Sequence, residues 1–151
     1  MRMPLLFILL PFLVTSCSIY KDVEVVEVRD VRMAELSQEG LGAEVDLMLQ
    51  NPNGYKVKVT GSDLNVWVNG REAGKVRLLE PVTILPRSTA SYTLKVHAPY
   101  DELAPGFLAS LISLLFVDAV AFKAEGYVQG KALGITRKVN VSVNETVPLG
   151  E

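Results

Sequence analysis

Very few side chains in this sequence could carry covalent or metal chemistry. Its 151 residues include one cysteine, Cys17, and one histidine, His97. The common zinc sites need several Cys or His ligands, and a Cys-His or Ser-His-Asp arrangement needs a histidine beside its nucleophile. His97 alternates with apolar residues on a predicted strand, which puts it on the polar, solvated face. We therefore predict no catalytic residue, no metal site, no cofactor and no enzymatic activity.

Cys17 follows a segment typical of secreted proteins. Arg2 gives a basic start, residues 5–14 are ten consecutive apolar residues, and the two residues before the cysteine are small. This is the order of a secretory signal peptide. The apolar block is too short for a membrane-spanning helix, which needs about 20 apolar residues. We expect residues 1–16 to be a signal peptide.

The stretch Val14-Thr15-Ser16-Cys17 resembles the bacterial lipobox, in which small residues precede a cysteine. In that family the thiol receives a diacylglycerol, the signal is cut before the cysteine, and the new amine is acylated, for example with palmitate. The resemblance implies that Cys17 is a lipid attachment site. A signal peptide with an incidental cysteine is the alternative. A thiol that carries acyl chains also explains why no second cysteine is present for a disulfide.

The resemblance also implies a location in the bacterial cell envelope. In the enteric version of the family, an aspartate after the cysteine retains the protein in the inner membrane, and this chain has Ser18 there. We therefore expect a lipid anchor in the outer membrane, facing the periplasm, rather than in the inner membrane. Residues 17–22 would form the lipidated terminus and a short tether. Ser18 to Asp22 reach roughly 17 Å when extended, so the domain should lie close to the bilayer.

The charge of the chain excludes one class of partner. From Cys17 onward the sequence has 14 basic and 17 acidic residues, a net charge of −3, and no basic block longer than the pair Arg137-Lys138. Binding to nucleic acid needs clustered Lys and Arg side chains to neutralise phosphates. We predict no nucleic-acid partner.

The rest of the chain alternates apolar and polar residues, which indicates half-buried β-strands. We expect a bulge at Val25-Val26, where the alternation changes face, and a hairpin turn at Asn69-Gly70. The clearest apolar rows are Leu41 to Leu49, Leu64 to Val68, Ala90 to Val96 and Val139 to Val143. Seven or eight strands at turn spacing predict an all-β, antiparallel β-sandwich over residues 23–147, followed by a tail at 148–151.

Residues 101–120 break this period of two. The acidic pair Asp101-Glu102 suits the first turn of a helix, and from Phe107 to Val117 only Ser110 and Ser113 are polar. We predict one apolar α-helix here. A helix that is apolar nearly all round is normally buried, but a domain of this size is too small to bury one completely.

The turn after the strand that ends at Leu49 is the most distinctive motif. Asn51-Pro52-Asn53 combines an extended residue before proline with turn residues after it. A Val-Lys-Val strand and the Asn69-Gly70 hairpin then follow in order. This order and spacing resemble the late-embryogenesis-abundant type 2 family, also called the water-stress-and-hypersensitive-response domain, over roughly Val23 to Val147.

The family resemblance implies an immunoglobulin- or fibronectin-III-like sandwich with one helix and no catalytic residues. It also implies a role in desiccation and stress protection, and membrane-attached relatives have been proposed to bind lipid. We therefore expect a non-enzymatic envelope lipoprotein that protects against stress or binds lipid or apolar surfaces. The alternative is an assembly module that docks an envelope partner through its apolar helix or a sheet edge.

A second stretch, Phe122 to Gly134, puts three glycines on one face of a strand: Gly126, Gly130 and Gly134. Glycine within a strand often marks the close approach of another backbone or a ligand. Either the helix packs directly on this strip, or helix and strip line a groove for an acyl chain or an apolar peptide. The helix residues that we assign to this contact are Phe107, Leu108, Leu111, Ile112 and Leu115. The outer side of the helix either packs or forms an apolar patch for a bilayer or a partner.

Overall fold

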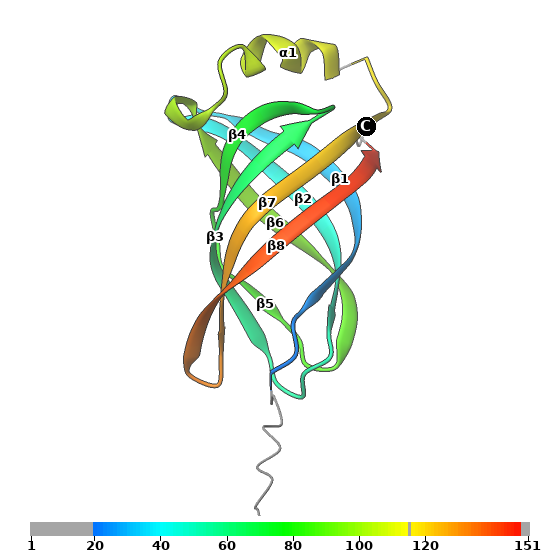
Figure 1. Cartoon of the computed structure of the whole chain (residues 1–151), viewed down its shortest axis with the longest axis vertical. Coiled ribbons are helices and arrows are strands. Elements are labelled where there is room, and N and C mark those ends of the chain that lie inside the picture. The colour runs from blue at the N-terminus through cyan, green and yellow to red at the C-terminus, as the bar shows by residue number, and fades with distance from the viewer. Residues whose placement is uncertain (1–19, 115, 149–151) are drawn as a thin grey trace, which may run out of the picture.

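The structure is a computed structural model that describes residues 20–114 and 116–148 (Figure 1). The predictions on the signal peptide, on Cys17 and on Leu115 lie outside the described residues, as does the C-terminal tail after Pro148.

The described chain consists almost entirely of strands. In chain order the elements are β1 (Glu24–Leu36), β2 (Gly40–Asn51), β3 (Val57–Val68), β4 (Arg71–Leu78), β5 (Val82–Ile84), β6 (Ser88–Pro99), a 3₁₀ turn (Tyr100–Glu102), α1 (Phe107–Leu114), β7 (Ala119–Ala132) and β8 (Ile135–Pro148). The strands pair antiparallel. The all-β class and the number of strands therefore agree with the sequence prediction.

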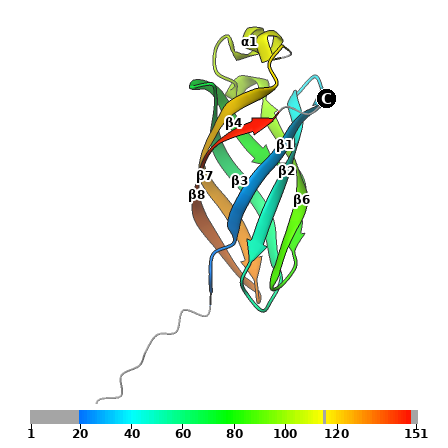
Figure 2. The same cartoon turned by 90° about the vertical axis from the view of Figure 1, so that its right-hand side faces the viewer.

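The predicted immunoglobulin-like sandwich of two separate layers is not clearly formed. The strands pair in one curled sheet in the order β1-β2-β6-β4-β3-β7-β8, with β5 beside β3. Its two halves face each other (Figures 1 and 2). β4 joins the halves, because it pairs with β3 as far as Val76 and with β6 at Arg77 and Leu78. The sheet is therefore continuous where a sandwich would be divided.

The apolar rows of the sequence point into the space between the two halves. Leu41 and Leu49 of β2 are buried, and so are Val66 of β3 and Val147 of β8. The bulge predicted near Val26 is also present, because the register between β1 and β2 shifts there. Alternation therefore predicted the facing of these strands correctly, since successive side chains of a strand point to opposite faces.

The curl brings the two edge strands, β1 and β8, towards each other. The backbone N–H of Val28 in β1 donates a hydrogen bond of 3.2 Å to Glu145 Oε2 in β8. Glu145 falls in the inward row of β8, between Val143 and Val147. Its carboxylate therefore accepts from a buried backbone donor that would otherwise lack a partner at the edge of the sheet.

The helix is much shorter than the predicted 101–120 and covers only Phe107–Leu114. Before it, the N–H of Ala104 donates to the carbonyl of Ala73 at 3.0 Å, which holds this segment against β4. Pro105 follows, and proline disfavours a helical conformation in the residue before it, so α1 begins only beyond it. Within the described residues, no helix is long and apolar enough to cross a membrane.

On the outer face of β1 and β2, one arginine forms ion pairs with three acidic side chains. Arg32 Nη1 lies 2.7 Å from Asp46 Oδ2 and 2.8 Å from Asp30 Oδ2, and its Nη2 lies 3.4 Å from Glu44 Oε2. Thr93 Oγ1 of β6 also donates to Asp46 at 2.5 Å. The hydroxyl of Thr93 and then the guanidinium of Arg32 hold the pKa of Asp46 below its usual value, because both stabilise the charged carboxylate.

This depressed pKa predicts acid sensitivity. The contribution of Asp46 to folding is present above its unfolded-state pKa, near 4, and is lost as the pH falls through the lower folded-state value. We expect the Tm to fall on acidification from about pH 5 to about pH 3, and to fall less in Asp46→Asn. Thermal unfolding followed by circular dichroism measures this, with Asp118→Asn, at an exposed position, as the control. An equal fall in wild type and Asp46→Asn would contradict the assignment.

Candidate functional site

The two ends of the curled sheet carry the residues that the sequence singled out. The end at which the described chain begins, called the Asn51 end below, is formed by residues 20–24, 51–58, 85–88 and 129–138. The opposite end, called the α1 end, is formed by the turns at 37–39 and 69–70 and by the segment that carries α1. Figures 1 and 2 show the Asn51 end at the bottom and α1 at the top.

The Asn51-Pro52-Asn53 motif forms a buried polar cluster at the Asn51 end. Asn51 is 1% exposed and Asn53 is 4% exposed. The side-chain amide of Asn51 donates to the carbonyls of Tyr55, at 2.9 Å, and Leu85, at 3.0 Å. Its Oδ1 accepts from the backbone N–H of Asn53 at 3.0 Å and from Asn53 Nδ2 at 2.9 Å. Asn51 thus uses both of its donors and both lone pairs of its acceptor.

Asn53 extends this cluster to the start of the described chain. Its Nδ2 donates to the carbonyl of Lys21 at 2.6 Å, and its Oδ1 accepts from the N–H of Lys21 at 2.9 Å. Its own carbonyl accepts from the N–H of Arg87 at 2.9 Å. The motif therefore joins the β2–β3 turn, the β5–β6 turn and the segment before β1. It fixes the backbone only four positions after Cys17.

The Asn51 end has a structural rather than a chemical character. The asparagine amides do not titrate, and they are consumed by backbone partners. Beside them the ring of Tyr20 lies 5.7 Å from the guanidinium of Arg137. Burial raises the pKa of Tyr20, Asp22 and Tyr55 raise it further, and Arg137 opposes them. Among the residues that the structure describes, no cluster of His, Cys, Asp or Glu could hold a metal ion.

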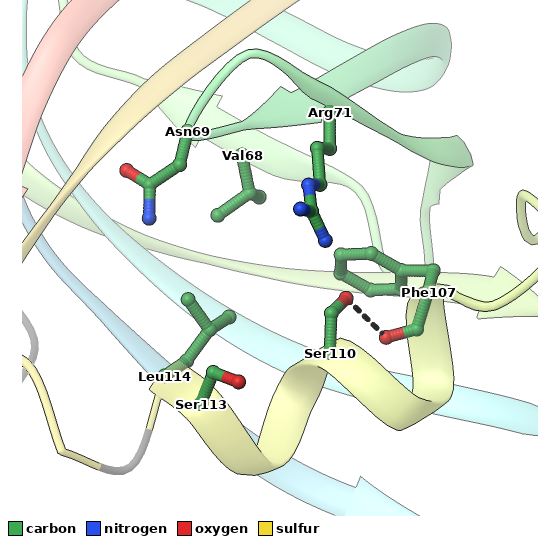
Figure 3. Close-up of a pocket in the computed structure, with 7 residues that line it drawn as sticks. All are labelled: Val68, Asn69, Arg71, Phe107, Ser110, Ser113 and Leu114. Atoms are coloured by element: carbon green, nitrogen blue, oxygen red, sulfur yellow. Dashed lines mark hydrogen bonds between the residues drawn. The ribbon is translucent and has the colours of Figure 1, made fainter.

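The α1 end contains a pocket of about 350 Å³ between the helix and the β3–β4 hairpin (Figure 3). Its lining mixes apolar side chains, hydroxyls, an amide and one cation. The lining residues are Val68, Asn69, Arg71, Phe107, Ser110, Ser113 and Leu114. Ser110 Oγ donates to the carbonyl of Phe107 at 2.7 Å, within α1 itself. The pocket therefore suits an amphipathic group better than a purely apolar one.

The residues of α1 divide into two faces. Phe107, Leu111 and Leu114 are half-buried, and Phe107 packs against the core cluster that contains Val66, Ala73 and Ala124. On the outer face Leu108 is 46% exposed and Ile112 is 64% exposed.

Beyond the helix, Phe116 is 83% exposed. No residue of α1 is fully buried. The outer side of the helix is therefore an apolar patch and not a packed surface.

The glycines of the strip contact β3 or lie in a turn, and α1 reaches β7, the strand of the strip, through Phe107, which packs against the cluster that contains Ala124. The groove between helix and strip stays a prediction. A Cβ at Gly126 would overlap the carbonyl oxygen of Asp63 in β3, and one at Gly130 would contact Val57. Gly134 lies in the β7–β8 turn at the Asn51 end (Figure 1). Gly126 is thus needed for the close approach of β3, with a φ of 155° that few other residues adopt.

Comparison with known proteins identifies the family. The sequence model described as late embryogenesis abundant protein, LEA_2, matches residues 46–145. The chain belongs to the LEA_2 family. The match runs from Asp46 in β2 to Glu145 in β8, so it includes the Asn51 cluster, the pocket and α1. The family resemblance inferred from Asn51-Pro52-Asn53 is therefore confirmed, and LEA_2 proteins have stress-related, generally non-enzymatic roles.

One solved structure agrees with the fold of this LEA_2 protein. A solution structure of an Arabidopsis thaliana protein aligns with a TM-score of 0.51 and 14% identity, covering 85% of this chain and 84% of that one. A crystal structure of a protein from Archaeoglobus fulgidus aligns with a TM-score of 0.44 and 11% identity, over 85% and 95% of the two chains. Only the first is similar enough to bear on the fold. A search of curated proteins finds no match.

Sequence reasoning missed the pocket of the α1 end. Val68, Asn69 and Arg71 come from the β3–β4 hairpin, and about forty positions separate them from Ser110, Ser113 and Leu114. The two serines were visible as the only polar residues of an apolar stretch. No sequence signal pairs them with the hairpin, because only the path of the segment after β6 brings α1 over its tip.

The Asn51 cluster predicts large losses of stability from small changes. In Asn51→Ala two backbone carbonyls and two donors of Asn53 lose their buried partner, which we expect to lower the free energy of unfolding by about 3 kcal/mol or more. Asn51→Asp should be almost as harmful, because a carboxylate cannot donate to the carbonyls of Tyr55 and Leu85. Urea unfolding measures both, with Asn140→Ala on the exposed face of β8 as the control. A change below about 0.5 kcal/mol in Asn51→Ala would contradict the cluster's role.

Asn53 offers a local test of the same cluster. In Asn53→Ala the N–H of Lys21 loses its acceptor, so its hydrogen exchange should speed up while amides in the middle of β2 stay protected. Hydrogen exchange followed by mass spectrometry resolves the two segments. Unchanged exchange at Lys21 would mean that Asn53 does not hold the start of the domain.

Proposed function

We propose that this LEA_2 protein is a non-enzymatic lipoprotein of the bacterial envelope, anchored through Cys17 in the outer membrane. It works by contact, through the apolar patch and the pocket of its α1 end. The contact protects other molecules or surfaces under water stress, in keeping with the family. One observation carries this proposal: an eight-residue helix with no buried residue presents exposed aliphatic side chains at one end of the sheet.

The proposed anchor would fix the orientation of the domain relative to the membrane. The tether from Ser18 to Asp22 reaches at most roughly 17 Å, and the hydrogen bonds between Asn53 and Lys21 keep it at the Asn51 end. Strands of 12 to 14 residues extend for roughly 40 Å. A domain anchored in this way would hold α1 away from the membrane that anchors it. The patch on α1 would then face the periplasm.

The exposed patch favours an apolar occupant. Leu108 and Ile112 lie one turn apart on the outer face of α1, and both are far more exposed than the core residues. Arg71 at the rim of the pocket makes no ion pair with any described carboxylate. An acyl chain with an anionic head, or an apolar segment of another protein with an acidic residue, would match both features.

The second candidate is an assembly module that docks one envelope protein. Because the anchored domain would hold α1 away from the membrane, docking of a protein is favoured over a contact of α1 with the anchoring bilayer. The helix supports docking better than a sheet edge does, because the edge strands β1 and β8 face each other and share the hydrogen bond between Val28 and Glu145.

The anchor itself predicts a labelling result. Cells that express the wild-type chain should incorporate radiolabelled palmitate into it, and Cys17→Ser should incorporate none and should leave the detergent-extracted membrane lipoprotein fraction. A conservative change at the neighbouring position, Ser18→Thr, serves as the control. Incorporation that persists in Cys17→Ser would overturn the anchor.

The patch predicts opposite effects on the two faces of α1. Ile112→Glu, at an exposed position, should change the free energy of unfolding by less than about 0.5 kcal/mol while abolishing binding. Leu111→Glu, on the packed face, should destabilise the fold by about 2 kcal/mol, because it buries a charge.

Two binding assays separate the candidates. Native mass spectrometry with lipid extract detects a bound lipid, and crosslinking in cells detects a single stoichiometric partner. If Ile112→Glu remained folded and kept both lipid and partner binding, the patch would not be the site.

A further inference from the structure

We propose that the Asn51 end docks onto an anionic phospholipid bilayer, with its cations on the headgroups and the β7–β8 turn in the interface. This deepens the proposed function and rests on it, because the lipid on Cys17 supplies the nearby membrane. The inference concerns a different surface from α1, at the other end of the sheet.

Charge is strongly segregated between the Asn51 end and the rest of the described chain. The Asn51 end carries two acidic residues, Asp22 and Glu24, and seven basic ones. The basic residues are Lys21, Lys56, Lys58, Arg87, Lys131, Arg137 and Lys138. The rest of the described chain carries seven basic and 14 acidic residues. A mildly acidic protein therefore has one positive end.

No carboxylate of the described chain neutralises the cations of the positive end, although Arg137 and Lys138 lie over the rings of Tyr20 and Tyr127. All seven side chains are exposed, and none of them forms an ion pair with a described carboxylate. Elsewhere in the described chain, six of the seven cations do form one. These are Arg29, Arg32, Lys75, Arg77, Lys95 and Lys123. The difference leaves the Asn51 end free to attract an anionic surface.

Two of these cations lie directly opposite each other on neighbouring strands, which lowers the stability of the sheet. Lys58 of β3 pairs directly with Lys131 of β7 in the ladder. Like charges that are directly opposite on neighbouring strands destabilise a sheet. An anionic surface close to both side chains would relieve this repulsion.

Large aliphatic side chains project among the cations. Leu133 is 68% exposed, Ile135 is 59% exposed and Leu85 is 57% exposed. Leu133 and Ile135 flank Gly134 at the tip of the β7–β8 turn, between Lys131 and Arg137. Aliphatic side chains bordered by Lys and Arg are the composition of surfaces that lie in a membrane interface.

A comparison of two turns in the same protein indicates that the backbone conformation of the turn does not explain the leucine at position 133. The β3–β4 turn has Asn69 with φ of 49° and Gly70 with φ of 75°, the residues that such a turn prefers. The β7–β8 turn has the same geometry, with φ of 51° at Leu133 and 80° at Gly134. A leucine is poorly suited to positive φ, whereas asparagine tolerates it. The exposed leucine at this position is therefore explained by a contact with a surface outside the turn.

A bilayer fits these features better than a soluble polyanion does. Phosphates alone would satisfy the cations but would leave Leu133 and Ile135 in water. The apolar boundary beneath the headgroups accommodates both, and each cation near an anionic membrane surface adds to the attraction. The hydrogen bonds of Asn53 to Lys21 also keep this end within a short tether of Cys17.

The test places a nitroxide label at the tip of the turn in the full chain. Leu133→Cys is compared with Gln38→Cys, an exposed position in the β1–β2 turn at the α1 end. The lipid blocks Cys17, so only the new thiol reacts. The chains are reconstituted in vesicles of phosphatidylcholine alone or with phosphatidylglycerol, and the accessibility of the label to oxygen and to a nickel chelate is measured.

On the vesicles that contain phosphatidylglycerol, the label at position 133 should gain oxygen accessibility and lose nickel accessibility, and the label at position 38 should stay in water. Adding Lys131→Glu and Arg137→Glu should lower the ratio of docked to undocked domain by more than roughly 30-fold, because each change removes a cation and adds an anion. The control Lys75→Glu with Lys95→Glu, in β4 and β6 and outside the Asn51 end, should have no such effect. High salt should also release the label, because it screens the headgroup charge.

The inference and the proposed function fail in different ways. The mass of the purified chain reports whether Cys17 carries lipid, and its absence would overturn the anchor. A lipidated chain whose label at position 133 remains as water-exposed as that at position 38 on anionic vesicles would overturn the docking surface alone. Equal insertion into phosphatidylcholine vesicles would overturn the role of the cations.

Discussion

The buried pair of asparagines, Asn51 and Asn53, is the constraint on which the rest of this protein depends. Amides that are almost without solvent contact hold three separate backbone segments, and every polar side-chain atom of Asn51 has a partner. A buried polar cluster of this kind is stable only when it is complete. It closes one end of the sheet and also fixes where the chain enters the domain, at Lys21.

The two ends of the sheet present different surfaces. The Asn51 end combines exposed aliphatic side chains with cations that form no ion pair with a described carboxylate, and the α1 end combines an apolar patch with a mixed pocket. Among the described residues, no cluster of His, Cys, Asp or Glu could hold a metal ion. With the proposed anchor at Cys17, the curled sheet would act as a spacer that holds the Asn51 end near the membrane and the α1 end away from it.

Local patterns predicted some elements of the fold well and others poorly. Alternation gave the inward rows of Leu41 and Val66 correctly, because the two faces of a strand differ in solvent exposure along the sequence itself. The joining of the two halves through Arg77 and Leu78 could not be inferred, because alternation says which face is buried and not which strand is the neighbour. The predicted helix, residues 101–120, is longer than α1, because the prediction followed the apolar composition of this segment and gave too little weight to Pro105.

The sequence by itself determined the family, through Asn51-Pro52-Asn53 and its spacing, and the all-β class, because turn chemistry and alternation act between residues that are close along the chain. Tertiary structure alone decided that Asn53 holds Lys21, that Gly126 meets β3, and that α1 covers the β3–β4 hairpin. It also decided the positive end. Lys21, Lys58, Arg87 and Arg137 are scattered along the chain, and no sequence window detects a charge cluster that three separate turns and the segment before β1 assemble in space.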